Sequence, residues 1–237
     1  MPPWPKIGLQ HVYRNKNGGA MTPKGGKRGY RSAKRDSAAE KTRARIIAAA
    51  NRQLRSAKGL RGLSLESVAA QAGVTRLTVY NQFGSRRGLL EALFDDVAFR
   101  GGLHRLPEAM AEQDPRVALR KVVAIFCDFW YFNRRMLGQI IGAGVADLRL
   151  ENAIRERNER RRKLLAVILK RLAGAGGAPP EVFDEVVDVL FVLTGHGVFS
   201  GLAARGRSVE TVCRLVQDLA LCILDRLQFS KSGVPHE

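Results

Sequence analysis

Residues 65–82 of the chain, LESVAAQAGVTRLTVYNQ, decide the fold. Two short helices can cross at a steep angle only where a small side chain lets their backbones approach, and Ala69 is such a residue. The turn between them needs a residue that tolerates positive φ, and Gly73 follows four positions later. Val79, ten positions after Ala69, would anchor the second helix on the first. This spacing of small, glycine and branched apolar residues is typical of a helix-turn-helix.

The helix-turn-helix is predicted to lie within a group of four helices. Apolar residues at helical spacing begin near Ala38, and a glycine after residue 58 ends that first helix. Ser64 and Thr75 suit the N-caps of the second and third helices, and Ser85 suits that of the fourth. A pair of glycines at residues 101–102 ends the fourth helix, so we expect a domain boundary there.

The second half of the chain is also predicted to be helical. Ser208 suits the N-cap of the last helix, and Pro180 suits the first turn of the helix before it. No alternating strand pattern competes, so the predicted fold class is all-α. Besides the last helix, the periodic segments of this half cover residues 115–132, 136–144, 147–172 and 181–204.

Positive charge is concentrated toward the N-terminus. The net charge is +18, and residues 1–37 carry nine Lys and Arg against one acid. Residues 38–100 carry eleven against five, whereas residues 101–237 carry twenty against sixteen. Solubility needs no such asymmetry, so it indicates a nucleic acid as the partner of this end. Residues 1–37 have no apolar period and are predicted to be a mobile basic arm.

The second helix of the motif would present polar and basic side chains to that partner. With Val79 turned inward, the outward set can bond phosphates and base edges in a major groove of double-stranded DNA. The set is Thr75, Arg76, Thr78, Asn81 and Gln82.

Residues 42–94 resemble the DNA-binding domain of the TetR (tetracycline-repressor) family of bacterial transcription regulators. The resemblance is carried by SLESVAAQAGV, TRLTVYNQF and GSRRGLL. It implies a repressor that binds a near-palindromic operator as a homodimer and is released by a small, largely apolar ligand. The implied domains are an arm (1–37), a helix-turn-helix DNA-binding domain (38–102), a helical ligand-binding and dimerisation domain (103–230) and a tail (231–237).

The resemblance also implies roles for single residues. Tyr80 would place its hydroxyl on a phosphate, and Phe83 would be a core residue between the helices. Arg86 stands where the family usually has a lysine, beside the N-terminal amides of a helix. Leu77 replaces a frequent glycine, so a thymine methyl contact becomes possible. The predicted DNA contacts are Ser64, Thr75, Arg76, Leu77, Thr78, Tyr80, Asn81, Gln82 and Arg86, with Lys27, Arg28 and Arg31 of the arm, which either enters the minor groove or adds only non-specific affinity.

Dimerisation is expected physically as well, because one helix-turn-helix offers little contact to an operator. Glycines inside the helix at residues 181–204 would let a partner helix approach, or they fit the protomer's own core. The apolar stripe of the last helix would lie beside them. The predicted dimer residues are Gly195, Gly197, Gly201, Val212, Leu215, Val216, Leu219 and Ile223.

Aromatic side chains of the second half either line an apolar ligand cavity or form ordinary core. His196 and Cys127 would add polar contacts to a ligand, or they too lie in the core. The charged run RERNERRRKLL at residues 155–165 is predicted to be a solvated helix face. The predicted ligand-binding residues are Phe126, Phe129, Trp130, Met136, Phe191, His196 and Phe199.

Other classes of protein find little support in the sequence. Three cysteines and four histidines form no metal-ligand spacing, and no nucleophile with a base or phosphate loop is visible, so no enzyme, metal or cofactor is predicted. No signal peptide or membrane span is read, which favours a soluble cytoplasmic protein of a bacterium, bound to the nucleoid when on DNA. Two alternatives stay open: an architectural or partner-regulated DNA-binding protein without a small ligand, and a thiol sensor through Cys127, Cys213 or Cys222.

Overall fold

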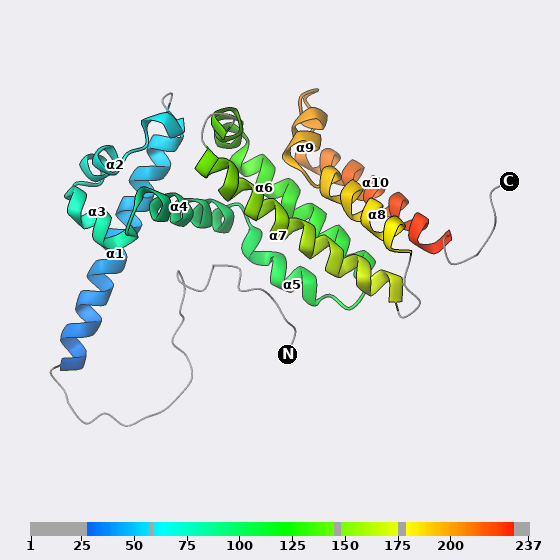
Figure 1. Ribbon diagram of the computed structural model, residues 1–237, viewed down its shortest axis with the longest axis horizontal. Coiled ribbons are helices and arrows are strands. Elements are labelled where there is room, and N and C mark those ends of the chain that lie inside the picture. Colours follow the sequence, from blue (N-terminus) through cyan, green and yellow to red (C-terminus); the bar gives the residue numbers. More distant parts are fainter. Residues whose placement is uncertain (1–27, 57–58, 145–147, 175–178, 230–237) are drawn as a thin grey trace. The chain divides into compact units, whose positions relative to one another are not determined.

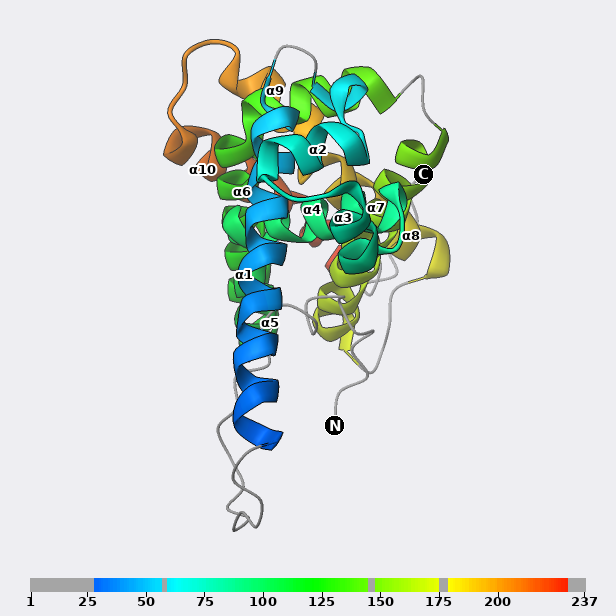
Figure 2. The same cartoon turned by 90° about the vertical axis from the view of Figure 1, so that its left-hand side faces the viewer.

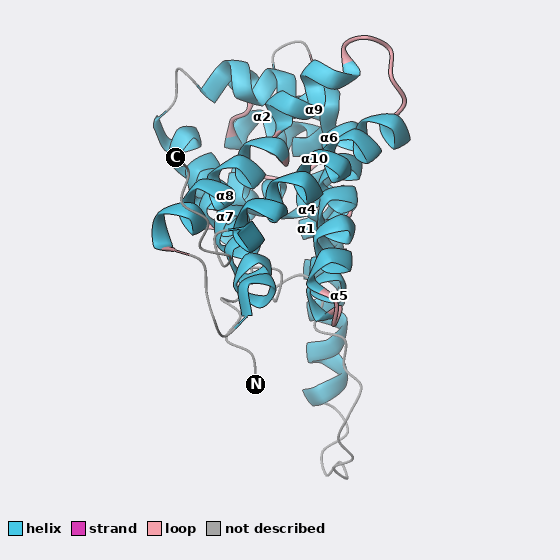
Figure 3. Cartoon of the chain, turned by 90° about the vertical axis from the view of Figure 1, so that its right-hand side faces the viewer, coloured by secondary structure: helices cyan, strands magenta, loops and turns pink. Residues whose placement is uncertain are grey.

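The structure is a computed structural model that describes residues 28–56, 59–144, 148–174 and 179–229. Every regular element within these ranges is a helix, which confirms the all-α prediction (Figure 3). The chain forms two compact units that divide between Asp96 and Val97, a few residues before the predicted boundary.

The first unit contains the predicted four-helix group. Its elements are α1 (Arg28–Leu54), the short η2 (Gly59–Gly62), α2 (Leu65–Ala72), α3 (Arg76–Phe83) and the first part of α4 (Arg86–Arg100) (Figure 1).

The first helix is longer than predicted. We expected α1 to begin near Ala38 after a mobile arm, whereas it begins at Arg28, and its N-terminal part extends beyond α2 and α3 (Figure 2). The side chains of residues 36–41 are exposed, so this part of α1 is helical without contributing to a core. Alanine, arginine and lysine dominate it, and their high helix propensity explains the extension. The remainder of the predicted arm, including Lys27, lies outside the described residues.

The core of the first unit comes from one face of each helix. The buried side chains of α1 recur every three or four residues, and Val68 of α2 and Val79 of α3 are fully buried as well. Ala69 is only 4% exposed, as expected where α2 and α3 approach each other. The other large, fully buried side chains of this unit are Ile46, Leu54, Leu63, Leu89 and Leu93.

The second unit is a helical bundle. In it, α6 packs against α7 and α10, and α8 packs against α7 and α10 (Figure 1). Its elements are η3 (Leu103–Arg105), α5 (Leu106–Ala111), α6 (Pro115–Gly144), α7 (Leu148–Ala173), α8 (Pro180–Leu193), α9 (His196–Ala203) and α10 (Val209–Phe229).

Two segmentation predictions for this unit were wrong. The segments 115–132 and 136–144 form one helix, α6, because nothing between them stops it, and Asn133 turns its amide back to the carbonyl of Phe129 (3.0 Å). Conversely, the segment 181–204 is broken into α8 and α9, which are bent by 47°. The break follows Thr194, whose hydroxyl bonds the carbonyl of Leu190 (2.8 Å) within its own helix.

No single helix among the described residues is long and apolar enough to cross a membrane. Only α8 and α9 taken together reach that length and composition, and they are the bent pair.

Gly101, which follows α4, permits a close contact in the second unit. A Cβ there would lie 2.4 Å from Phe129 Cδ2 and 2.6 Å from Asn133 Nδ2. Both neighbours are buried, so they have little room to move. We therefore expect Gly101→Ala to lower the free energy of unfolding by about 1–3 kcal/mol, measured by urea denaturation.

Gly138 of α6 is the matched control, because a Cβ there meets no atom within 4 Å. Gly138→Ala is expected to raise the free energy of unfolding by up to about 1 kcal/mol, since alanine is the better helix former. Equal stabilities for the two variants would contradict the close packing at Gly101.

Candidate functional site

The two helices of the helix-turn-helix begin at the predicted caps. The Ser64 hydroxyl accepts from the Ser67 amide (3.0 Å), and the Ser67 hydroxyl accepts from the Ser64 amide (3.0 Å), which is a reciprocal capping box. The Thr75 hydroxyl accepts from the Thr78 amide (3.1 Å) at the start of α3. Short polar side chains at fixed spacing therefore define where both helices start.

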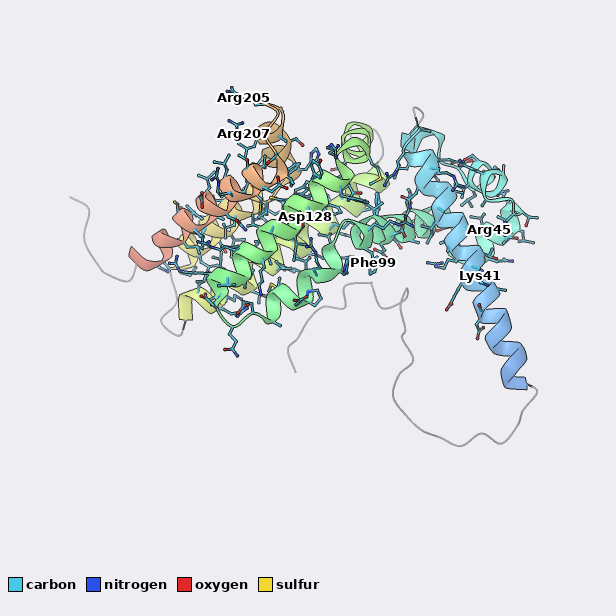
Figure 4. All side chains as sticks on the ribbon, turned by 180° about the vertical axis from the view of Figure 1, so that it is seen from behind. Lys41, Arg45, Phe99, Asp128, Arg205 and Arg207 are labelled. Atoms are coloured by element: carbon cyan, nitrogen blue, oxygen red, sulfur yellow. The ribbon has the colours of Figure 1, made fainter. Side chains whose placement is uncertain are left out.

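The turn between α2 and α3 uses Gly73 as predicted. Its φ of 64° is left-handed, and its amide bonds back to the carbonyls of Ala69 and Ala70. Arg45 of α1 completes this helix end, because its Nη2 donates to the carbonyls of Ala72 (2.7 Å) and Gly73 (3.2 Å) (Figure 4). A cation at a helix C-terminus also interacts favourably with the helix dipole.

A second arginine of α1 holds the end of α3. Arg43 Nη1 donates to the carbonyl of Gln82 (3.0 Å), and its guanidinium lies over the Phe83 ring, 4.4 Å from the centroid. Phe83, predicted as a core residue, is half-buried under this arginine. Arg43 and Arg45 were not predicted, because residues two apart on a helix point to different sides and form no recognisable pattern.

We expect Arg43→Met to lower the free energy of unfolding by about 1–2 kcal/mol, because a half-buried charged hydrogen bond and a ring contact are lost. Lys41→Met is the control, since Lys41 is an exposed cation on the same helix (Figure 4). Urea denaturation of both variants checks this. The role of Arg43 is disproved if the two substitutions cost the same.

The outer face of α3 is accessible. Val79 is fully buried and fixes the helix, whereas Leu77 is 65% exposed and Tyr80 is 55% exposed. Thr75, Arg76 and Asn81 are exposed as well. The structure therefore exposes four of the predicted DNA-contact residues on α3 and a fifth, Thr75, at its N-cap.

Several of the predicted contact residues also have partners within the unit. The Thr75 and Thr78 hydroxyls share a hydrogen bond (2.9 Å), and Arg76 forms an exposed ion pair with Glu66 of α2 (2.7 Å). Such an exposed pair is weak, so a phosphate can compete for Arg76. Arg86 Nε donates to the Leu63 carbonyl (3.1 Å), which joins the first turn of α4 to the residue before the α2 cap.

The remaining predicted DNA contacts are Gln82 of α3 and the three basic residues of the arm. Gln82 is half-buried on α3. Arg28 and Arg31 belong to α1, but their side chains, like Lys27 as a whole, lie outside the described part of the chain.

The aromatic residues predicted to bind ligand come together in the second unit. Phe129 meets Trp130 edge-on with centroids 4.7 Å apart, and Trp130 meets His196 of α9 edge-on at 5.6 Å. Burial lowers the pKa of His196, whose ring contacts the Ser200 hydroxyl (Nε2 to Oγ, 3.0 Å). Of the remaining predicted residues, Phe126, Met136 and Phe199 are buried and Phe191 is half-buried.

Arg161 of α7 is buried beside these rings, which corrects the prediction that residues 155–165 form a solvated face. Only 8% of Arg161 is exposed. Its Nη1 donates to the carbonyl of Thr194 (2.7 Å), which also accepts from Trp130 Nε1 (2.9 Å). The sequence does carry a signal for this position, because Arg161 lies four residues before the buried Leu165, on the same helix face.

The residues predicted for the dimer interface divide into two groups. Val212 and Val216 lie in the core of the protomer, so their side chains are not available to a partner subunit. Leu219 is 50% exposed, and Leu215 and Ile223 are half-buried.

The three glycines predicted for the interface differ in their position relative to α9. Gly195 is the N-cap of α9, not a residue inside a helix. Gly197 and Gly201 lie within α9 and are exposed, and a Cβ on either would meet no atom within 4 Å. Those two glycines are therefore not required by the protomer's own core.

Two cysteines of the second unit are neighbours. A hydrogen bond from the Cys127 thiol to the Cys213 sulfur raises the pKa of Cys127 and lowers that of Cys213. Cys127 is buried, and Cys222 is exposed. Among the described residues, no group of three or more His, Cys, Asp or Glu side chains is arranged to hold a metal ion.

A capped helix-turn-helix followed by a second helical unit defines the class: a DNA-binding protein with an attached helical domain. A family model described as bacterial regulatory proteins, tetR family, matches residues 46–93. The matched segment is the helix-turn-helix with the start of α4, so this part of the chain is of the TetR type and supports a DNA-binding transcription regulator.

The fold is shared with solved structures along most of the chain. A TetR-like transcriptional regulator from Rhodococcus sp. RHA1 is similar with a TM-score of 0.57 and 19% identity, over 76% of this chain and 93% of that one. A TetR transcription regulator from Haloarcula marismortui ATCC 43049 is similar with a TM-score of 0.59 and 17% identity, over 78% and 97%. Comparison with curated protein sequences gives no match.

Proposed function

We propose that the protein is a repressor that binds a near-palindromic operator as a homodimer and is released by a small ligand of the second unit. The observation that carries this proposal is the face of α3, where Val79 is fully buried while Leu77 and Tyr80 stay exposed. An exposed tyrosine and an exposed leucine beside Arg76 and Asn81 suit a major groove, with its phosphates and thymine methyls. The protein acts by binding and not by catalysis, in the cytoplasm of a bacterium.

Dimerisation through α8 and α10 supports operator binding. One helix-turn-helix gives few base contacts, and two copies related by a two-fold axis double them on a palindrome. These two helices pack side by side and keep apolar side chains exposed: Val192 at 59%, Val189 at 37% and Leu219 at 50%. Open space at Gly197 and Gly201 of α9 gives a partner further room to approach.

For a ligand to release DNA, a structural change at the aromatic residues must reach α4. Phe129 lies in ring contact with Trp130 and also lies against Gly101, the residue after α4. Because α4 contributes residues to both units, a ligand that moves Phe129 acts on the end of a helix shared with the DNA-binding unit. A ligand that favours a conformation poorly matched to the operator weakens DNA binding by the same coupling free energy.

Selection of bound fragments from bacterial genomic DNA tests this function, with the purified protein at a stated near-physiological salt concentration. We expect one short inverted repeat, lost when Tyr80 and Arg76 are both changed to alanine. Broad binding without a motif would reject an operator-specific dimer and support the architectural alternative.

A thiol sensor is a second candidate, supported by the contact between Cys127 and Cys213. In this case oxidation of the two thiols, and not the binding of a ligand, would cause the protein to release DNA. If a Cys127→Ser, Cys213→Ser double variant loses DNA on oxidation as the wild type does, this candidate is abandoned.

A further inference from the structure

Arg161 is a buried cation without a carboxylate partner among the described residues of the second unit. Arginine is seldom buried this deeply unless it is paired with an acid. Among the described side chains no ion pair joins Arg161 to a carboxylate, and the charged neighbour that acts on it is Arg162. Arg162 is itself paired with Asp188. Burial and then Arg162 lower the pKa of Arg161 to about 10, so it is still a cation at neutral pH.

The protein uses only part of the guanidinium. Nη1 donates to the Thr194 carbonyl at the break between α8 and α9 (2.7 Å). Nη2 has one long contact, to Asn158 Oδ1 (3.4 Å), and the buried Nε has no partner among the described atoms. Nε and Nη2 form one edge of the guanidinium, and two parallel hydrogen bonds along such an edge match the two oxygens of a carboxylate.

Aromatic rings surround the same guanidinium. Its carbon lies 4.3 Å from the Phe191 centroid, 5.7 Å from Trp130 and 5.8 Å from Phe126. These rings stabilise the cation and present apolar surface beside it. An amphipathic ligand would therefore find a charged group and an apolar wall in one place.

We propose that the ligand of the second unit is an amphipathic carboxylate, whose two oxygens pair with the Nε–Nη2 edge of Arg161 while its apolar part lies on Phe191, Trp130 and Phe126. This inference rests on the proposed function, because it names the chemical class of the ligand that releases DNA. It narrows the largely apolar ligand predicted from the sequence by adding an anionic head. The bond from Nη1 to Thr194 explains why an arginine is present, but it leaves Nε without a partner and Nη2 with one long contact.

The fluorescence of Trp130 is expected to report on ligand binding at Arg161, because the Trp130 indole and Arg161 donate to the same Thr194 carbonyl. The chain has two tryptophans, so a Trp4→Phe background makes Trp130 the single fluorophore. The full-length protein is titrated with decanoate and 2-naphthoate, and in parallel with decanamide and 2-naphthamide. The amides keep the shape of the carboxylates and remove their charge.

We expect at least one carboxylate to bind at least roughly tenfold more tightly than its amide, because the charge-assisted pair is lost in the amide. Arg161→Gln should abolish that preference. Arg160→Gln is the matched control: the same substitution one residue away at an exposed position, which should keep the preference. Circular dichroism and the melting temperature show whether each variant is folded.

If Arg161→Gln does not fold, the preference is measured with Arg161→Lys. This substitution keeps the charge and removes the pair of parallel donors Nε and Nη2. It should reduce the preference for the carboxylate to a few-fold. The inference is overturned if carboxylate and amide bind equally, if neither series binds, or if a folded Arg161 variant keeps the full preference. Release of operator DNA by the amides alone would overturn it and leave the proposed function intact. Carboxylate binding to a protein that selects no operator would uphold the site and overturn the proposed function.

Discussion

Tyr80→Ala is expected to lower operator affinity more than any other single substitution on α3. The side chain is 55% exposed on the outer face of a helix whose opposite side is fixed by Val79. Loss of one specific contact typically costs about 1–3 kcal/mol, and a homodimer loses it in both half-sites. The affinity should therefore fall by roughly 30-fold to 10⁴-fold. Fluorescence anisotropy with a labelled operator duplex at fixed salt measures it.

Tyr131→Ala is the matched control, since Tyr131 is also an exposed tyrosine (45%) but lies on α6 in the second unit. It should leave operator affinity unchanged. A Tyr80→Ala variant that binds as tightly as the Tyr131→Ala variant would remove α3 from the DNA interface. A phosphate contact by Tyr80 would weaken binding to all sequences alike, whereas a base contact would relax the sequence preference at one position.

The second large effect is expected from Leu219→Glu on α10. Leu219 is half exposed, so the substitution should hardly change the stability of the protomer. In a two-fold dimer formed through α8 and α10, each copy would place a carboxylate in an apolar interface, close to its counterpart. Like charges brought together cost several kcal/mol, so the variant should be monomeric in sedimentation velocity experiments at micromolar concentration. Its affinity for a palindromic operator should fall by at least roughly 100-fold, because each monomer contacts a single half-site.

Val167→Glu provides the comparison for this experiment. Val167 is an exposed valine of α7 (39%) and receives the same charge outside α8 and α10. This variant should stay dimeric and keep its affinity for the operator. If the Leu219→Glu variant sediments as a dimer, as Val167→Glu is expected to, the protein dimerises through another surface.

The helix-turn-helix was predictable because its determinants are local. The caps at Ser64 and Thr75 and the left-handed Gly73 depend on hydrogen bonds within a few residues, so their spacing is visible in the sequence. The inward Val79 follows from helical periodicity alone. The roles of α3 residues on DNA stay predictions, because they depend on a partner.

Segment ends were less predictable where they depend on weak local preferences. The extension of α1 to Arg28 reflects helix propensity without burial, which an apolar period does not report. The break after Thr194 is stabilised by Trp130 and Arg161, donors from two other helices. No pattern within residues 181–204 shows that such donors exist.

The sequence by itself determined that the chain is all-α, that it carries a helix-turn-helix and which face of α3 is turned outward. The tertiary structure decided which neighbour each helix face meets: Arg43 and Arg45 at the ends of two other helices, Val212 and Val216 in the protomer core, and Arg161 among aromatic rings. The physical reason is that hydrogen bonding and periodicity within a helix act over a few residues. Burial of a side chain depends on which helix covers it, and that helix comes from a distant part of the chain.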